Sequence, residues 1–259
     1  MNTVISKDGT TIAFDQIGSG PPVVLVCGGS VDRMSNATLA EHLSAHFTVY
    51  NYDRRGRGDS GDTLPYAIER EIEDIDAMIG VAGGSISLYG SSSGAALALA
   101  AAASDLDITK LALWEPPFIV DESRPRPAAN TAEIYRNFVA EGRRGDAVEY
   151  FMAKVVGLPP EFVAFARSEP WWSAQEAIAH TLAYDAEIMG DYALPHERTA
   201  SVMIPTLVLD GGASFPWMAE TAQALVTILP NGQRRTLPGQ QHNVDAAVLG
   251  PVLAAFFGN

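Results

Sequence analysis

Residues Gly90-Ser91-Ser92-Ser93-Gly94 form a G-x-S-x-G motif. In such a motif the central serine occupies a sharp turn between a strand and a helix, which exposes its hydroxyl to a substrate carbonyl. The context fits, because residues 85–89 are predicted to be a strand and residues 93–103 a small-residue helix. The sequence therefore predicts Ser92 as a nucleophile. Ser91 and Ser93 are rival hydroxyls outside the central place, and the alternative is a Ser- and Gly-rich turn without chemistry.

A serine hydroxyl needs a base, and the chain has five histidines. His242 follows Leu237-Pro238-Gly239-Gln240-Gln241, a loop after the last predicted strand. In parallel sheets, loops at the carboxyl ends of strands converge on the site. We therefore predict His242 as the general base. The alternative is a surface loop histidine. The other histidines fall in flanking helices or in the middle of the chain, where they could at most line a pocket.

The elements around these residues alternate between strands and helices. A hairpin is expected at the N-terminus, over residues 3–6 and 10–14, because Lys7-Asp8-Gly9 reads as its turn. The other predicted strands are 23–27, 47–52, 85–89, 110–114, 206–209 and 234–237. The predicted helices are 36–46, 66–79, 93–103, 217–228 and 244–257. This alternation is typical of an α/β fold whose mostly parallel sheet carries helices on both faces.

The alternation stops between residues 116 and about 199. This segment favours helices over residues 130–141, 146–156, 161–167 and 173–189, with a Pro-rich loop before them. The sequence predicts a core split by a helical insertion, with the boundaries 1–115, 116–200 and 201–259.

Composition narrows the class of protein. The chain has 259 residues, 47% of them hydrophobic, and a formal net charge of -14. Such a charge disfavours nucleic acid and anionic membrane surfaces as partners, because both are bound by clustered Lys and Arg. Cys27 is the only cysteine, so no internal disulfide can form. With no signal peptide recognised at the N-terminus and no long apolar stretch, we expect a cytoplasmic protein without membrane contact.

Several motifs together resemble the α/β-hydrolase superfamily, in particular its small cap-bearing serine hydrolases. They are Val26-Cys27-Gly28-Gly29, Asp53-Arg54-Arg55-Gly56-Arg57-Gly58-Asp59-Ser60, the serine motif and the Gln241-His242 loop. The D-x-R-G-x-G-x-S run is specific to that branch, and we interpret it as structural. The resemblance implies an eight-stranded, mainly parallel sheet with a helical cap inserted after the sixth strand.

The resemblance also places an oxyanion hole, which needs two backbone N–H donors. One should come from Ser93, the residue after the nucleophile, and the other from Gly29 in the loop after Val26. Most relatives have a histidine where this chain has Cys27. We interpret Cys27 as a buried thiol that packs in the core.

The expected acid is missing. Most of the family carries it three residues after the glycine that follows the seventh strand, and that position here holds Ser214. Two carboxylates remain: Glu115 at the end of the sixth strand and Asp210 at the tip of the seventh. We favour Glu115, because some relatives, the haloalkane dehalogenases among them, carry their acid at this strand end. Either residue could instead be structural, Glu115 as a solvated loop carboxylate and Asp210 as a turn former.

These residues predict cleavage of an ester, thioester or lactone through an acyl-enzyme, without cofactor or metal. An aspartate nucleophile, as in dehalogenases and epoxide hydrolases of this fold, is absent. We expect a small to medium hydrophobic substrate, with a pocket lined by aromatic residues at Phe118, Trp171, Trp172 and Trp217. We expect a monomer or a small homo-oligomer. The alternatives are a perhydrolase, acyl transferase or biosynthetic cyclase on the same fold, or a binding protein that has lost turnover.

Overall fold

The computed structural model describes residues 1–258 and contains one sheet of eight strands. The strands are β1 (Asn2–Ile5), β2 (Thr11–Gly18), β3 (Pro22–Val26), β4 (Thr48–Tyr52), β5 (Ile86–Ser91), β6 (Ile108–Trp114), β7 (Thr206–Gly211) and β8 (Gly232–Leu237). Their order across the sheet is β1-β2-β4-β3-β5-β6-β7-β8. β1 and β2 pair antiparallel to their neighbours, and the other pairs are parallel. The predicted α/β fold is confirmed.

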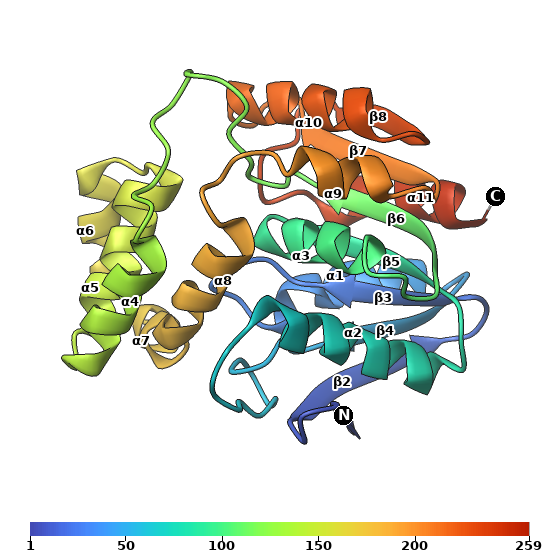
Figure 1. Ribbon diagram of the computed structural model, residues 1–259, viewed down its shortest axis with the longest axis horizontal. Helices are drawn as coiled ribbons and strands as arrows, with labels where there is room; N and C mark the ends of the chain where they lie inside the picture. Colours follow the sequence, from blue (N-terminus) through green and yellow to red (C-terminus); the bar gives the residue numbers. More distant parts are fainter. Residues whose placement is uncertain (259) are drawn as a thin grey trace.

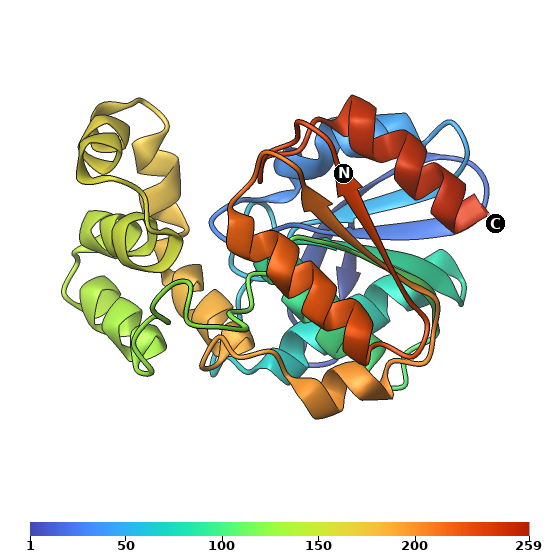
Figure 2. The ribbon, with the colours of Figure 1, turned by 90° about the horizontal axis from the view of Figure 1, so that it is seen from above.

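Two helical layers cover the sheet, as Figure 2 shows. One face carries α1 (Ala37–Leu43), preceded by the 3-10 turn η1 (Arg33–Asn36), and α11 (Ala246–Gly258). The other carries α2 (Ile68–Ala82), α3 (Ser93–Ala102) and α10 (Pro216–Ile228). The side chains of β3 alternate between the two cores: Val23 and Leu25 pack with α1, whereas Val24 and Val26 pack with α2 and α3. A strand buried on both faces explains the continuous apolar run in the sequence.

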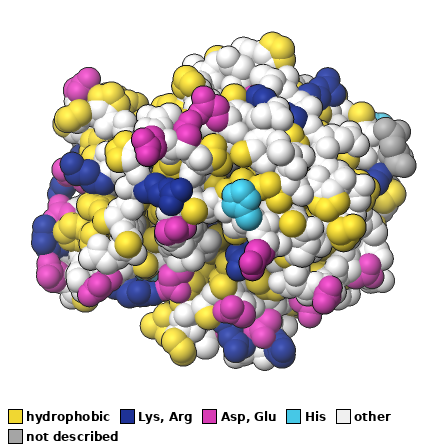
Figure 3. Space-filling model, turned by 45° about the horizontal axis from the view of Figure 1, so that its top comes forward, with side chains coloured by type: hydrophobic (Ala, Val, Ile, Leu, Met, Phe, Trp, Pro, Cys, Tyr) yellow, Lys and Arg dark blue, Asp and Glu magenta, His cyan; other side chains and the backbone are white. Residues whose placement is uncertain are grey.

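Residues 115–205, between β6 and β7, form helices and loops, which we call the helical insertion. Its helices are α4 (Thr131–Ala140), α5 (Arg144–Tyr150), the π-helical η2 (Phe151–Val156), α6 (Pro160–Ser168), α7 (Trp172–Ala177), η3 (Ala179–Thr181), α8 (Leu182–Met189) and α9 (His196–Ser201). In Figure 1, α4 to α7 form a lobe beside the sheet, and α8 leads back to the helices of the core. The lobe has its own core, which includes Tyr135, Val148 and Trp172. Figure 3 shows acidic and basic side chains interspersed over this lobe.

One helix prediction in the insertion was wrong, and one short helix was not predicted. The single helix expected over residues 173–189 is broken into α7, η3 and α8, because both the backbone N–H and the hydroxyl of Thr181 bond to the carbonyl of Ile178. These bonds close a tight 3-10 turn in place of the α-helical ladder. The short helix α9, which begins directly after Pro195, was not expected at all.

Candidate active site

Ser92 occupies the turn between β5 and α3 in a strained conformation. Its φ is 54° and its ψ is -127°, a region that residues with a side chain rarely adopt. The Ser92 N–H donates to the carbonyl of Trp114 at 2.8 Å, and its carbonyl accepts from the N–H of Ala95 at 2.9 Å. The turn is therefore fixed from both sides, and the partly exposed Ser92 side chain lies at the carboxyl edge of the sheet.

The two glycines of the motif allow this turn to pack closely. A Cβ atom added to Gly90 would lie 2.4 Å from the carbonyl oxygen of Gly94. A Cβ atom added to Gly94 would lie 2.3 Å from the carbonyl oxygen of Cys27. Any side chain at either position would collide with backbone, so α3 can approach β3 and β5 only because both residues are glycine.

Glu115 and His242 form a close pair next to this turn. Glu115 Oε2 lies 2.6 Å from His242 Nδ1. The carboxylate also accepts hydrogen bonds from the N–H of Gly211, at 2.8 Å, and from the hydroxyl of Ser214, at 2.9 Å. The Glu115 side chain is fully buried, whereas that of His242 is 33% exposed. A buried carboxylate with three hydrogen-bonding partners is held in a single orientation toward the imidazole.

Trp114 connects the serine turn to the histidine loop. Its carbonyl accepts from Ser92, and its indole N–H donates to the carbonyl of His242 at 2.8 Å. The backbone of Gly211 also packs closely on the histidine loop, since a Cβ atom added to Gly211 would lie 2.4 Å from the carbonyl oxygen of Gln240. The three strand ends therefore bring Ser92, Glu115 and His242 to one edge of the sheet. In the described part of the chain, the Ser92 hydroxyl and the His242 ring are not hydrogen-bonded to each other.

Asp210, the alternative acid, has other partners. Its carboxylate accepts from Arg234 Nε at 2.8 Å and from the Thr236 hydroxyl at 2.9 Å. Both partners lie on β8, so Asp210 bonds to the neighbouring strand while Glu115 faces His242. Ser214, where most of the family would carry the acid, instead donates its hydroxyl to Glu115.

Gly29 and Ser93, the predicted oxyanion donors, lie against each other. A Cβ atom on Gly29 would be 3.2 Å from Ser93 Oγ, and one on Gly28 would be 3.2 Å from Ser92 Cβ. The loop after β3 therefore packs directly on the first turn of α3. Cys27, at the start of this loop, is buried, and its burial raises the pKa of the thiol. A buried, protonated thiol is unreactive.

The four aromatic residues predicted for the pocket have different surroundings. Trp172 is buried in the lobe, where its indole N–H donates to Glu176 at 2.9 Å, whereas Trp171 is 42% exposed. Phe118 is buried in the core beneath the sheet. Trp217 is half-buried at the start of α10 and stacks with Phe215. The Arg124 guanidinium covers it, with Cζ 4.6 Å from the centroid of the Trp217 ring. Of these four, Trp217 is closest in the chain to a partner of Glu115.

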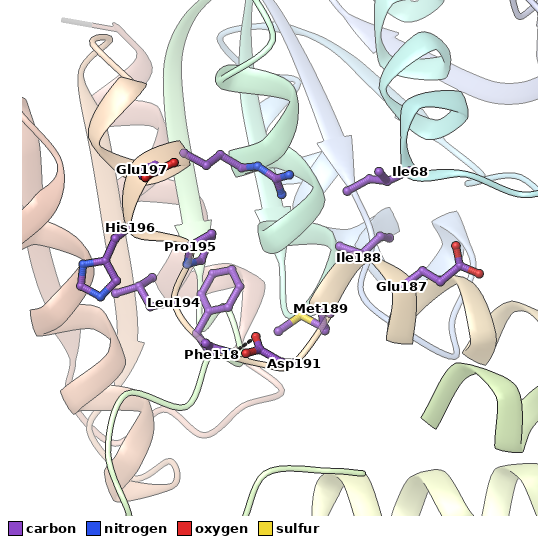
Figure 4. A pocket seen from close by; sticks show the side chains of 13 residues that line it. Ile68, Phe118, Glu187, Ile188, Met189, Asp191, Leu194, Pro195, His196 and Glu197 are labelled. Atoms are coloured by element: carbon purple, nitrogen blue, oxygen red, sulfur yellow. Dashed lines mark hydrogen bonds between the residues drawn. The ribbon is translucent and has the colours of Figure 1, made fainter. Parts of the chain in front are cut away.

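A cavity of about 510 Å³ lies away from the serine, between the end of α8 and the start of α9. Figure 4 shows Phe118, Met189 and Leu194 lining it, with His196 and Glu197 at its side. Ser92, Glu115 and His242 do not contribute to its walls. Among the described residues, no group of three or more His, Cys, Asp or Glu side chains is arranged to hold a metal ion. Within residues 1–258, no helix has the length and apolar character to cross a bilayer.

One buried charged group beside the serine was not predicted from the sequence. Asp185 of α8 accepts hydrogen bonds from Arg54, Arg57 and the Ser93 hydroxyl. The two arginines belong to the D-x-R-G-x-G-x-S run and could have been singled out there. Asp185 lies in the helical insertion and carries no motif, so the sequence alone offered no signal for it.

Comparison with known proteins identifies the family of this fold. The model of the Alpha/beta hydrolase family matches residues 23–249. The chain belongs to the alpha/beta hydrolase family. It is similar to an alpha/beta hydrolase structure from Sphaerobacter thermophilus DSM 20745, with 55% identity, a TM-score of 0.94 and coverage of 99% of this chain and 100% of that one.

Two further relatives of this alpha/beta hydrolase are more distant. The uncharacterized hydrolase YraK from Bacillus subtilis (strain 168) is 32% identical over 102 residues, which span 38% of each chain. The fold of an esterase (EaEST) from Exiguobacterium antarcticum matches with a TM-score of 0.76 at 18% identity, over the whole of both chains. The family and these neighbours support a hydrolase.

Proposed function

We propose that this alpha/beta hydrolase is a serine hydrolase that cleaves carboxylic esters, thioesters or lactones through an acyl-enzyme. The observation that carries the proposal is the 2.6 Å contact between Glu115 Oε2 and His242 Nδ1, at the sheet edge where the strained turn presents Ser92. A nucleophile, a base and a buried carboxylate that orients the base are the three parts that acyl transfer by serine requires.

In the proposed reaction, the Ser92 oxygen attacks the substrate carbonyl carbon and its proton passes to His242 Nε2. The Nδ1–H of His242 faces Glu115, so the ring presents its unprotonated Nε2 to the serine, and the carboxylate stabilises the imidazolium that forms. The serine hydroxyl and the imidazole come within hydrogen-bonding distance when substrate binds, as catalytic groups commonly do.

The backbone N–H groups of Gly29 and Ser93 stabilise the tetrahedral oxyanion. When the intermediate collapses, the C–O or C–S bond to the leaving group breaks, and His242 returns the proton to that group. A water molecule, deprotonated by His242, then attacks the acyl carbon. The bond between this carbon and Ser92 Oγ breaks, His242 returns the proton to the serine oxygen, and the carboxylic acid leaves. These steps use only groups of the chain and water.

The helical insertion acts as a cap in this proposal and selects a small to medium hydrophobic substrate. Phe215 follows Ser214 directly in the chain and stacks with Trp217 at the start of α10. They offer an apolar surface beside the proposed triad.

Labelling with a fluorophosphonate probe tests the proposal, because the probe phosphonylates activated serines. We expect stoichiometric labelling of Ser92 in the wild-type chain, loss of labelling in Ser92→Ala and His242→Ala, and hydrolysis of p-nitrophenyl butyrate with release of free butyrate. Labelling at another serine, or no labelling and no ester turnover, would contradict the proposal. Transfer of the butyryl group to an added alcohol without formation of free acid would indicate an acyl transferase.

A further inference from the structure

Asp185 is a buried carboxylate that the proposed reaction does not use. It lies on α8 of the helical insertion, and its Oδ1 accepts from Ser93 Oγ at 2.8 Å and from Arg54 Nη1 at 2.9 Å. Arg57 Nη2 donates to both carboxylate oxygens, at 2.9 and 2.8 Å. A Cβ atom on Gly29 would lie 3.0 Å from Asp185 Oδ2. The carboxylate therefore lies directly behind both proposed oxyanion residues.

The charges around Asp185 balance. Arg54 turns its other edge to Glu71 of α2, with Nε and Nη2 donating at 2.7 and 2.8 Å, and the Tyr66 hydroxyl also donates to Glu71 at 2.8 Å. Burial alone would raise the pKa of Asp185, but Arg57, Arg54 and the Ser93 hydroxyl together hold that pKa below its usual range. Asp185 is therefore ionised, and its charge is compensated within the cluster.

Arg57 connects the Asp185 carboxylate to the loop that follows β3. Its Nη1 donates to the carbonyl of Gly28 at 2.5 Å and to that of Val31 at 3.3 Å. The carbonyl of Gly28 and the N–H of Gly29 belong to one peptide plane and point in opposite directions, because the peptide is planar and trans. A guanidinium that holds the Gly28 carbonyl therefore sets the direction in which the Gly29 N–H points.

We propose that Asp185 and Arg57 are positioning residues for the oxyanion hole: Asp185 anchors Arg57 and the first residue of α3, and Arg57 fixes the Gly28–Gly29 peptide so that its N–H faces the reacting carbonyl. The inference rests on the proposed function. It also makes the oxyanion hole dependent on the helical insertion, because Asp185 comes from α8 while the groups it holds belong to the sheet core.

The structure offers a matched control for the same ionic chemistry. Arg55 and Asp74 form another buried bidentate pair, with Nε and Nη2 each 2.8 Å from the carboxylate. Both side chains are fully buried, and the hydrogen bonds of Arg55 go to Asp74, to Asp8 and to the carbonyl of Arg70, none of which belongs to the loop after β3 or to α3. Asp74→Asn therefore breaks a comparable ion pair without reaching the oxyanion residues.

The experiment compares Asp185→Asn, Arg57→Met, their combination and Asp74→Asn. It measures kcat and KM for p-nitrophenyl butyrate, the inhibition constant of a butyl trifluoromethyl ketone and the melting temperature. The ketone forms a hemiketal with serine, so its affinity reports the oxyanion hole directly. Removing one oxyanion donor lowers kcat by about 100- to 1,000-fold. We expect a misdirected donor to lower it by about 10- to 100-fold, with KM within threefold of wild type and the inhibition constant raised by a similar factor.

The double variant should lose no more than the worse single variant, because both changes disable one arrangement. Asp74→Asn should lose thermal stability and keep kcat. Ser93→Ala, which removes only the hydroxyl donated to Asp185, serves if Asp185→Asn does not fold, with an expected loss in kcat of about three- to tenfold.

Equal effects of Asp185→Asn and Asp74→Asn on kcat, or a change in KM alone, would overturn the inference while wild-type turnover and Ser92 labelling still supported the proposed function. Absence of both in the wild type would overturn the two proposals together.

Discussion

Replacing Glu115 by glutamine tests the proposed triad where the sequence left it open. The substitution keeps the shape of the side chain but removes its charge and one acceptor. The Gly211 N–H is rigid and donates to Oε1, so the glutamine oxygen should stay there and its NH2 group should face His242 Nδ1. The ring must then accept at Nδ1 and carry its proton on Nε2, where the reaction requires a free lone pair.

The same change of tautomer in a serine protease triad lowers kcat by about 10,000-fold. At about 1.36 kcal/mol for each factor of ten, this corresponds to about 5.4 kcal/mol of transition-state stabilisation. Since Glu115 is fully buried and lies 2.6 Å from the ring, we expect Glu115→Gln to lose at least about 1,000-fold in kcat. The assay is steady-state hydrolysis of p-nitrophenyl butyrate, with the melting temperature measured in parallel. A variant that folds and keeps kcat within tenfold of wild type would refute this reasoning.

Ser214 provides a rescue of the same variant. Its hydroxyl already lies 2.9 Å from Glu115 Oε2, and most of the family would carry the acid at this position. Ser214→Asp in the Glu115→Gln background should therefore return a carboxylate to His242 and recover at least about tenfold in kcat. Ser214→Asp alone should reduce stability, because two carboxylates would then share one buried site.

Three further predictions concern residues around the site. Asp210→Asn should keep kcat within about threefold and lower the free energy of urea unfolding by about 1–3 kcal/mol through its pairing with Arg234; a loss of activity above about 100-fold would make Asp210 the acid. Gly94→Ala should lower that free energy by about 3 kcal/mol, because its Cβ would lie 2.3 Å from the Cys27 carbonyl; unchanged unfolding would contradict the close packing of α3. The pKa of Asp185 is lowered from 3.8, so its contribution to stability is present above about pH 4 and is lost as the pH falls further. The difference in free energy of unfolding between wild type and Asp185→Asn should therefore be constant from about pH 8 to 5 and shrink below about pH 4. A difference that grows in acid would contradict a lowered pKa of Asp185.

Much of the fold could be predicted from the chain because local patterns specify it. The apolar run at residues 23–27 can be buried only between two helical layers, and the glycines around Ser92 are needed wherever a strand turns sharply into a helix. The break in alternation after residue 115 located the helical insertion. The path inside it was less predictable, since the turn at Thr181 depends on hydrogen bonds that compete with a continuing helix.

Sequence alone placed Ser92 and His242 at strand ends and reduced the acid to Glu115 or Asp210. It favoured Glu115 but could not establish which carboxylate contacts His242, because β6 and β7 are neighbours and residues at the ends of both reach the same edge of the sheet. The contact with His242 depends on the other hydrogen bonds of each carboxylate. Arg234 and Thr236 on β8 hold Asp210, whereas the Gly211 N–H and the Ser214 hydroxyl direct Glu115 toward His242.

Asp185 is the other feature that only the tertiary structure decided. It lies 92 residues from Ser93 and belongs to a helix whose pattern indicates nothing beyond packing. Its contact with the serine turn arises when α8 packs on α3 and buries the carboxylate beside two arginines. The spacing of residues along the chain predicts local features such as turns and the buried faces of helices. The partners of a buried charge depend instead on how elements distant in the sequence pack together.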